Sequence, residues 1–234
     1  MFIISEISPQ FGNDLFVAEQ MILQSKLYGA SAVKLQLYPA EMFFPKPVSS
    51  YVKARELSFE QFERLYRYGE RIGIPVFATA FDSQRLGWCV ELGQPYYKVA
   101  ARQHQEQPDL VREILALNRP TFVSVPAEMP LESVPSHDKC IFLRCVSQYP
   151  TLLEDVQMPN FRETPFCGLS DHSVGVAAAI MSSALGATHL EKHFTISHGR
   201  QRHDEKGHLG AMDAQQLEML AQIAGDISRI PFVG

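Results

Sequence analysis

Short apolar runs alternate along this chain with longer segments in which apolar residues recur every three or four positions. The runs are typical of buried strands, and the longer spacing is typical of amphipathic helices. Eight strands are predicted in this way, at Phe2–Ile7, Ala32–Leu37, Pro75–Ala80, Tyr96–Ala100, Pro120–Val125, Cys140–Val146, Phe166–Leu169 and Ala187–Phe194.

Helical spacing fills most of the segments between these strands. It predicts one helix from a cap at Asp82 or Ser83 to Leu92, and five others at Leu15–Tyr28, Phe59–Ile72, Pro108–Leu117, Val176–Leu185 and Ala214–Ile227. The helix at Phe59–Ile72 is expected to have Ser58 as its N-cap and Gly73 just past its end. Alternating strands and helices favour a parallel sheet, and eight strands are the number that closes a (β/α)8 barrel. We therefore predict an α/β fold, a TIM barrel in a single domain over residues 1–234.

Three segments do not follow the helical pattern. Ala127–Lys139 is rich in proline and Thr151–Thr164 is irregular, so we expect loops or short turns in these two crossovers. Pro39–Ser50 is predicted to be a long loop after the second strand. An open doubly wound sheet is the alternative architecture, but no glycine-rich phosphate loop follows the first strand.

Composition and charge narrow the class of protein. The 234 residues are 46% hydrophobic and 20% charged, which is enough to bury a full core. The net charge of -5 argues against sequence-independent binding of nucleic acid. No apolar stretch reaches the length of a membrane span, and the N-terminus has no signal-like segment. The four cysteines lack paired spacing and are expected to be reduced thiols in a cytoplasmic protein.

Two histidines carry the clearest chemical signal. His172 lies in GLSDHSVG and His193 in THLEKHFT, each where a predicted strand ends. His189, Glu191 and His193 alternate, so they share one face of a strand. Two imidazoles and a carboxylate then meet at the ends of neighbouring strands, where neutral imidazoles bind transition metals. This arrangement points to an enzyme, although satisfied core histidines remain the alternative.

Chemistry in a barrel of this kind lies at the C-terminal ends of the strands. The other polar residues that fall there are Glu6, Gln36, Thr79, Ser124, Ser147, Tyr149 and Ser170, with Asp204 in a later polar loop. Lys34 and Lys98 lie within apolar strands, where an unpaired ammonium group costs several kcal/mol. Each is expected either to pair with a carboxylate such as Glu6 or to bind an anion, and the nearby hydroxyls favour a phosphate. Glu191 is expected either to form an ion pair with Lys192 or Lys98, or to belong to the candidate site together with the two histidines.

Several motifs together resemble one family. The sialic acid synthases and their legionaminate and pseudaminate relatives carry similar motifs in the same order. The motifs in this chain are FATAFDS, LGQPYYKVA, CVSQYPT, GLSDHSVG and LEKHFT, with an aspartate about ten residues after the last. The resemblance runs from Glu6 to about Asp213. It implies a (β/α)8 transferase of carbohydrate biosynthesis that condenses phosphoenolpyruvate with an aldose such as N-acetylmannosamine. The products would be a 3-deoxy-2-keto sugar acid and phosphate.

The same resemblance implies roles for single residues. Mn²⁺ or Mg²⁺ would be bound by His172 and His193, with Glu191 beside the metal and the reacting centre. Phosphoenolpyruvate would be held by Lys34, Lys98, Thr79, Ser124, Ser147 and Ser170, and the sugar by Glu6, Gln36, Tyr149 and Asp204. The predicted catalytic residues are Glu6, Glu191 and the two histidines. Both substrates are small molecules, no nucleic acid or membrane partner is expected, and relatives suggest a homodimer.

The sequence also departs from the family pattern. Gln10 and Phe11 stand where the family usually has Asn-His, and Ala101, Arg102 and Gln103 stand where it commonly has serine and then Gly-Glu. Arg102 is predicted to replace a lost anion contact, because guanidinium binds phosphate and carboxylate well. The family's C-terminal antifreeze-like domain has no counterpart before Gly234, so the sugar pocket is expected to be built differently or completed by another protein. Two alternatives follow: a barrel that binds a sugar or phosphate without turnover, and an accessory subunit of a larger synthase.

Overall fold

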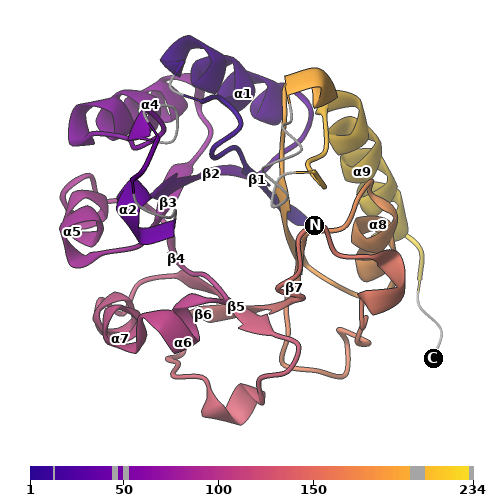
Figure 1. Ribbon diagram of the computed structural model, residues 1–234. Helices are drawn as coiled ribbons and strands as arrows, with labels where there is room; N and C mark the ends of the chain where they lie inside the picture. Colours follow the sequence, from indigo (N-terminus) through magenta and orange to yellow (C-terminus); the bar gives the residue numbers. More distant parts are fainter. Residues whose placement is uncertain (13, 44–46, 50–52, 201–208, 232–234) are drawn as a thin grey trace.

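Eight parallel strands surround a central axis in the computed structural model, which describes residues 1–12, 14–43, 47–49, 53–200 and 209–231 (Figure 1). The strands follow the order β3-β2-β1-β8-β7-β6-β5-β4 in one nearly closed sheet, with helices outside it. Their bounds are β1 (Phe2–Glu6), β2 (Ala32–Leu37), β3 (Val76–Ala80), β4 (Tyr97–Val99), β5 (Thr121–Pro126), β6 (Cys140–Cys145), β7 (Gly168–Asp171) and β8 (His189–His193). The predicted barrel is confirmed, and the doubly wound alternative is wrong.

The helices of the outer layer include all six that the sequence predicts. They are α1 (Leu15–Leu27), α4 (Phe59–Ile72), α5 (Ser83–Glu91), α7 (Pro108–Ala116), α8 (Ala177–Ala184) and α9 (Ala214–Ile227). The signals at α4 act as predicted: Ser58 and Gln61 form a capping box, and Gly73 ends the helix with a φ of 75°. No helix in the described part of the chain is long and apolar enough to cross a bilayer.

Two short helices with described bounds were not predicted, α2 (Ala40–Phe43) and α6 (Gln103–Glu106). The prediction of a loop across Pro39–Ser50 is therefore wrong at α2. The first turn of α2 is held by a distant carboxylate, because Glu56 Oε1 accepts a hydrogen bond of 2.6 Å from Ala40 N. A cap supplied from another segment leaves no local pattern in the sequence. The crossovers at residues 127–139 and 146–167, both fully described, contain no α-helix but the 3₁₀ turns η1 (Leu131–Ser133) and η2 (Leu153–Asp155), as expected.

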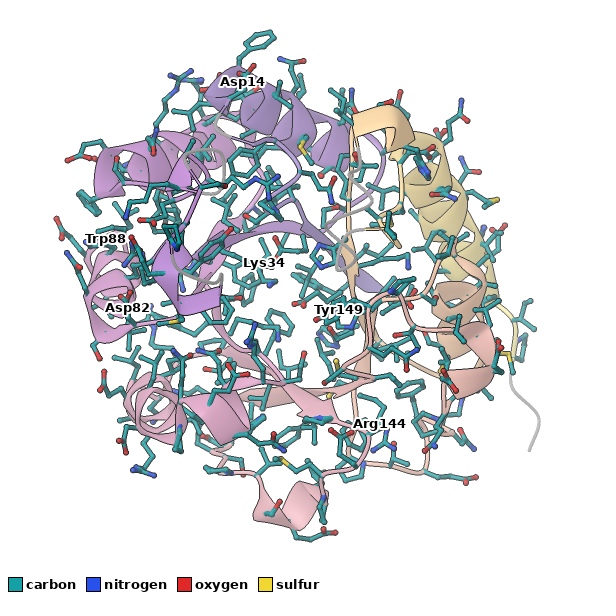
Figure 2. The ribbon with its side chains drawn as sticks, in the orientation of Figure 1. Asp14, Lys34, Asp82, Trp88, Arg144 and Tyr149 are labelled. Atoms are coloured by element: carbon teal, nitrogen blue, oxygen red, sulfur yellow. The ribbon has the colours of Figure 1, made fainter. Side chains whose placement is uncertain are left out.

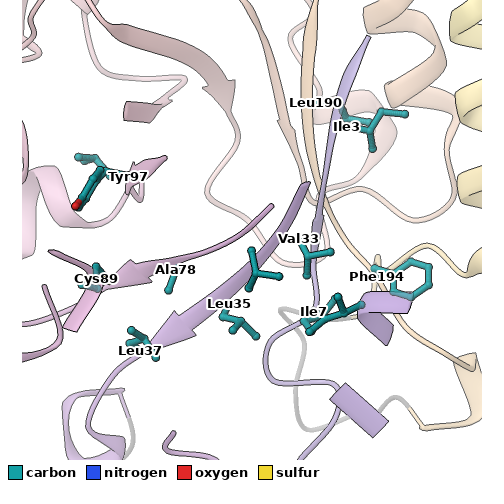
Figure 3. Close-up of a cluster of buried hydrophobic side chains, with 14 of the residues drawn as sticks. Ile3, Ile7, Val33, Leu35, Leu37, Ala78, Cys89, Tyr97, Leu190 and Phe194 are labelled. Carbon is teal, nitrogen blue, oxygen red and sulfur yellow. The ribbon is translucent and has the colours of Figure 1, made fainter. Parts of the chain in front are cut away.

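Alternation along the strands separates an apolar outer layer from the barrel interior. On β2, Val33 and Leu35 face the surrounding helices (Figure 3), so Lys34 and Gln36 face inward. The N-terminal end of the interior is filled by rings whose centroids lie 5.4 to 5.9 Å apart, those of Phe2, Phe77, Tyr96, Phe122 and His189. This aromatic floor leaves the polar interior open only toward the C-terminal ends of the strands.

Glutamine side chains bridge the seam between β3 and β4, where the described residues form no backbone ladder. Gln94 Oε1 accepts from Ala78 N at 2.9 Å, and its Nε2 donates to Ala78 O at 3.3 Å. Gln103 Nε2 donates to Ala80 O at 3.0 Å, and its Oε1 accepts from Ala100 N at 2.8 Å. Each amide satisfies backbone groups that a neighbouring strand would otherwise pair.

Candidate active site

The C-terminal ends of the strands open into a cavity of about 630 Å³. Figure 2 shows Lys34 and Tyr149 near the central opening of the barrel. Of the residues predicted from sequence, Asp204 lies outside the described residues, and all the others line this cavity. They are Glu6, Lys34, Gln36, Thr79, Lys98, Arg102, Ser124, Ser147, Tyr149, Ser170, His172, Glu191 and His193. Residues from all eight strands or their C-terminal ends thus converge, while their roles stay predictions.

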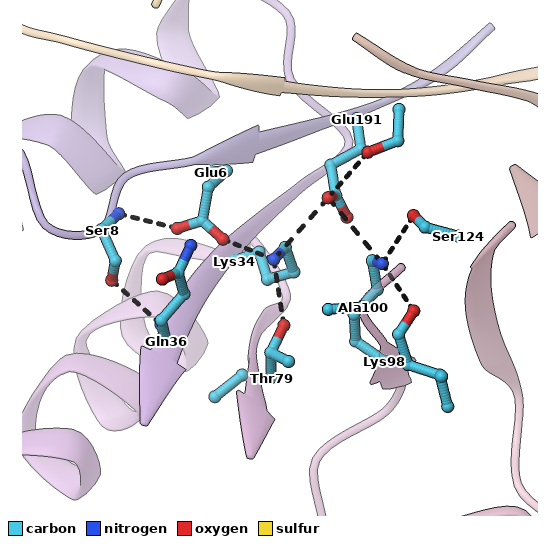
Figure 4. Close-up of polar contacts among 12 residues, drawn as sticks. Glu6, Ser8, Lys34, Gln36, Thr79, Lys98, Ala100, Ser124 and Glu191 are labelled. Atoms are coloured by element: carbon cyan, nitrogen blue, oxygen red, sulfur yellow. Dashed lines mark hydrogen bonds and ion pairs between the residues drawn. The ribbon is translucent and has the colours of Figure 1, made fainter. Parts of the chain in front are cut away.

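Lys34 is held from three sides at the centre of the cavity. It forms an ion pair with Glu6, donates a hydrogen bond of 3.0 Å to Thr79 Oγ1, and places its Nζ 3.7 Å from Glu191 Oε1 (Figure 4). Glu6 is held in turn, because its Oε1 accepts from Ser8 N at 2.7 Å. The expected pairing with Glu6 is therefore present, together with a hydroxyl suited to an anion.

Lys98 occupies a matching position across the cavity. Its Nζ donates to Ser124 Oγ at 2.7 Å and to Val99 O at 2.8 Å, and lies 3.9 Å from Glu191 Oε1. One oxygen of Glu191 thus lies between two ammonium groups (Figure 4). The predicted partner Lys98 is correct for Glu191, whereas Lys192 lies on the other face of β8 and pairs with Asp171.

Burial and charge act in opposite directions on these groups. Burial disfavours the charged form of Glu191, but Lys34 and Lys98 outweigh it and lower the pKa of this carboxyl. Burial also opposes the charge of Lys34, and Glu191 and Glu6 outweigh it, so the pKa of Lys34 is raised. Burial lowers the pKa of Lys98 to about 8, because Glu191 only partly offsets it. Lys98 is therefore the group in the cluster whose charge changes just above neutral pH.

The second oxygen of Glu191 has no partner among the described residues. Glu191 Oε2 is buried and accepts no hydrogen bond there, while Oε1 accepts a hydrogen bond of 3.3 Å from Ser170 Oγ. A buried acceptor without a partner costs roughly 1–3 kcal/mol. A ligand hydroxyl or a water molecule in the cavity would satisfy it.

The imidazole of His172 has a defined tautomer. Its Nδ1 lies 3.0 Å from Val146 O, an acceptor only, so Nδ1 carries the proton and Nε2 keeps its lone pair. Burial lowers the pKa of His172 to about 4, which keeps the ring neutral. The ring centroid lies 4.0 Å from that of Tyr149 and 6.0 Å from that of His193. A neutral ring with one nitrogen available is the form that binds metals.

The separation of the two imidazoles fits a shared cation. With a metal–nitrogen distance of about 2.1 Å, the centroids of two coordinating rings lie up to about 6.5 Å apart, compared with the observed 6.0 Å. Within the described ranges, no third histidine, cysteine, aspartate or glutamate joins them in a metal-binding group. Two imidazoles would leave the remaining coordination positions of a metal ion to water or substrate oxygens.

The departures from the family pattern have structural roles. Both polar atoms of the Gln103 amide bond to the backbone, and the side chain is fully buried, so it is held in the β3–β4 seam. Phe11 packs in the apolar core. Arg102 lies at the cavity mouth, where its Nε donates to Glu106 Oε2 at 2.8 Å. Its predicted contact with a substrate anion stays a prediction.

Sequence reasoning missed several residues that line the cavity, among them Arg55 and Cys145. Arg55 is 5% exposed and enters from the segment before α4, where no strand pattern marks it. Cys145 is the last residue of β6, so its inward face was readable from alternation. Burial raises the pKa of its thiol to about 11, which keeps it protonated.

Comparisons with known proteins identify the family and the fold. The sequence profile of the NeuB family matches residues 21–230. The chain is 32% identical to an uncharacterized protein, MJ1065, of Methanocaldococcus jannaschii, over 83% of this chain and 62% of that protein. It is 26% identical to the N,N'-diacetyllegionaminic acid synthase of Legionella pneumophila, over 98% of this chain and 72% of that enzyme. The N-acetylneuraminic acid synthetase of Leptospira borgpetersenii superposes with a TM-score of 0.85 at 25% identity, over 97% of this chain and 83% of that structure.

Proposed function

Because the chain belongs to the NeuB family, we propose that it condenses phosphoenolpyruvate with an aldose to give a 3-deoxy-2-keto sugar acid and phosphate. One observation carries the proposal. Two buried ammonium groups, each bonded to a hydroxyl, flank one carboxylate in a cavity that is also lined by the imidazoles of His172 and His193. Relatives named as synthases of legionaminic, pseudaminic and neuraminic acids support the product class.

The two lysine–hydroxyl pairs match the two anionic groups of phosphoenolpyruvate. Lys34 with Thr79 forms one donor pair, and Lys98 with Ser124 forms the other. Hydrogen bonds from an ammonium group to phosphate or carboxylate are charge-assisted and roughly twice as strong as neutral ones. Held at both ends, the substrate would present its carbon 3 in a fixed orientation, which lowers the entropic barrier to bond formation.

The reaction needs one carbon–carbon bond and one water molecule. Carbon 3 of phosphoenolpyruvate attacks the aldehyde carbon with the alkene electron pair, leaving carbon 2 electron-poor. The oxygen of a water molecule adds to carbon 2, and one proton of that water passes through a base to the former aldehyde oxygen, which becomes a hydroxyl. The phosphate then leaves with the electrons of its bond to carbon 2 and takes up the second proton as the new carbon 2 hydroxyl becomes the keto group. The acceptor oxygen Glu191 Oε2, which has no partner among the described residues, is suited to orient that water and take the proton.

His172 and His193 would hold the divalent cation. A bound Mn²⁺ or Mg²⁺ supplies Lewis-acid polarisation of the aldehyde oxygen. The hydrogen bond from His172 to Val146 O leaves the correct nitrogen available for it. The acceptor sugar would then lie toward the mouth, near Gln36 and Tyr149, the latter 41% exposed.

A direct assay tests this proposal. The purified chain is incubated with phosphoenolpyruvate, Mn²⁺ and a panel of aldoses that includes N-acetylmannosamine and phosphorylated sugars, and phosphate and product mass are measured. We expect phosphate release only when both substrates are present. Saturable phosphoenolpyruvate binding without turnover with any sugar would instead favour a binding barrel or an accessory subunit. Absence of both binding and turnover would contradict the proposal.

The affinity for phosphoenolpyruvate should depend on pH through Lys98. The pKa of this lysine is about 8 in the free site, and a bound anion favours its charged form. Below pH 8 the group is already protonated, whereas above pH 8 binding must take up a proton. We therefore expect KM for phosphoenolpyruvate to rise by about tenfold per pH unit above pH 8. Steady-state kinetics from pH 7 to pH 10 measure this, and a flat KM between pH 8 and pH 9.5 would contradict it.

A further inference from the structure

A buried ion pair lies directly behind the two imidazoles, outside the cavity. Lys192 Nζ lies 2.7 Å from Asp171 Oδ2, and the two side chains are 0% and 1% exposed. Asp171 and Lys192 are register partners on β7 and β8, and each immediately precedes one of the histidines, His172 and His193. The pair therefore joins the two strands at the points from which the rings project.

The same lysine also holds the backbone beyond His172. Lys192 Nζ donates a second hydrogen bond of 2.7 Å to Ser173 O. Asp171 Oδ1 accepts from Ser173 N at 2.8 Å and from Ser173 Oγ at 2.7 Å. The residues on both sides of His172 are thus bonded to the residue that precedes His193, which couples the positions of the two rings.

Other contacts hold each histidine toward a different neighbour. His172 is bonded to the β6 side, through its ring to Val146 O and through its carbonyl from Thr151 N at 3.1 Å. His193 pairs in the ladder with Glu6 of β1. The ladder between β7 and β8 ends at Asp171 and Lys192. The ion pair is therefore placed to set the distance between the histidines.

Stability alone does not account for a fully buried ion pair. Removing both ions from water costs several kcal/mol each, and a well-packed apolar pair of similar volume is often as stable or more stable. A buried ion pair does, however, impose one geometry on the groups that it joins. We propose that Asp171 and Lys192 are positioning residues that hold His172 and His193 at the separation needed to bind one divalent cation, an inference that rests on the proposed function.

A double variant separates positioning from folding. Asp171→Leu with Lys192→Met removes both charges together, so neither is left buried and unpaired. We expect a cooperatively folded protein whose Kd for Mn²⁺, measured by calorimetry or electron paramagnetic resonance, is raised about 10- to 100-fold, as for other outer-shell partners of metal ligands. A matched control, Glu19→Gln with Arg64→Met, removes an ion pair between α1 and α4 and should leave this Kd unchanged. A folded double variant that binds Mn²⁺ as tightly as the wild type would overturn the proposal.

A second readout needs no metal. Nitrogen-15 NMR of the histidine rings, assigned with a His172→Gln variant, reports which ring nitrogen of His172 carries the proton. In the metal-free wild type we expect the Nδ1–H form bonded to Val146 O, and in the double variant a mixture of tautomers. If the wild type binds no Mn²⁺, the proposed metal site is wrong. The NMR spectrum still tests whether Asp171 and Lys192 position the ring of His172. An unchanged His172 spectrum in the folded double variant would then refute it.

Discussion

Replacing Lys98 with methionine is expected to lower phosphate release from phosphoenolpyruvate by about 10²- to 10³-fold, the loss typical for removing one pre-organised hydrogen-bond donor. Lys98 supplies one of the two ammonium groups of the cavity and orients the Ser124 hydroxyl at 2.7 Å. Methionine keeps most of the volume of the side chain but carries no positive charge. The substrate then loses one of its two anchoring groups, and of the two lysines beside Glu191 in the described structure Lys34 remains.

The fold should survive this substitution. Burial disfavours the charge of Lys98, as its lowered pKa of about 8 shows, so removing the charge relieves a desolvation penalty, and Glu191 is not left unpaired because Lys34 Nζ still lies 3.7 Å from its Oε1. We expect the urea midpoint to stay close to that of the wild type. Lys139→Met is the matched control, because Lys139 Nζ bonds Asn118 O at an exposed position outside the cavity. A variant that keeps a third of its activity, or that loses activity only by unfolding, would disprove the assigned role.

Replacing Gly168 with alanine is expected to prevent the chain from reaching a stable folded state. A Cβ at this position would lie 1.7 Å from the carbonyl oxygen of His189 and 2.6 Å from its carbonyl carbon. Gly168 and His189 are register partners in the β7–β8 ladder, so the clashing atoms belong to the backbone and cannot rotate away. Overpacking of side chains already costs roughly 1–3 kcal/mol, and separating two paired strands costs more.

The yield of soluble protein and the urea midpoint measure this effect. Gly87→Ala is the control, because Gly87 lies inside α5 and a Cβ there meets nothing within 4 Å. Alanine should stabilise that helix by about 0.5–1 kcal/mol, since glycine loses more backbone entropy on folding. A Gly168→Ala protein with a wild-type midpoint would show that the two strands approach less closely than described.

Much of the fold follows from local patterns. In AVKLQL, alternation alone places Lys34 and Gln36 on the face opposite Val33 and Leu35, and the structure confirms this. The same period predicts that Glu191 and His193 share a face, and both line the cavity. The C-terminal location of the polar ends follows from the barrel itself. A strand has a period of two in any context, so its sequence is sufficient to separate its faces.

Contacts between distant segments were only partly predicted: the sequence suggested Glu6 for Lys34, but left Glu191 between Lys98 and Lys192. The sequence predicted the seventh strand at Phe166–Leu169, but β7 runs from Gly168 to Asp171, because its backbone pairs with β8 as far as Asp171 and Lys192. Arg55 enters the cavity from a segment without strand character, and Gln103 is held in the β3–β4 seam by backbone groups of two strands.

The sequence by itself therefore determined the number of strands, the face of each side chain and the set of polar residues at the strand ends. The tertiary structure decided which carboxylate meets which ammonium group and which amide bridges the seam. The physical reason is that a face depends on backbone dihedrals within one strand, whereas a partner depends on register between strands, and register is set only when the whole barrel packs.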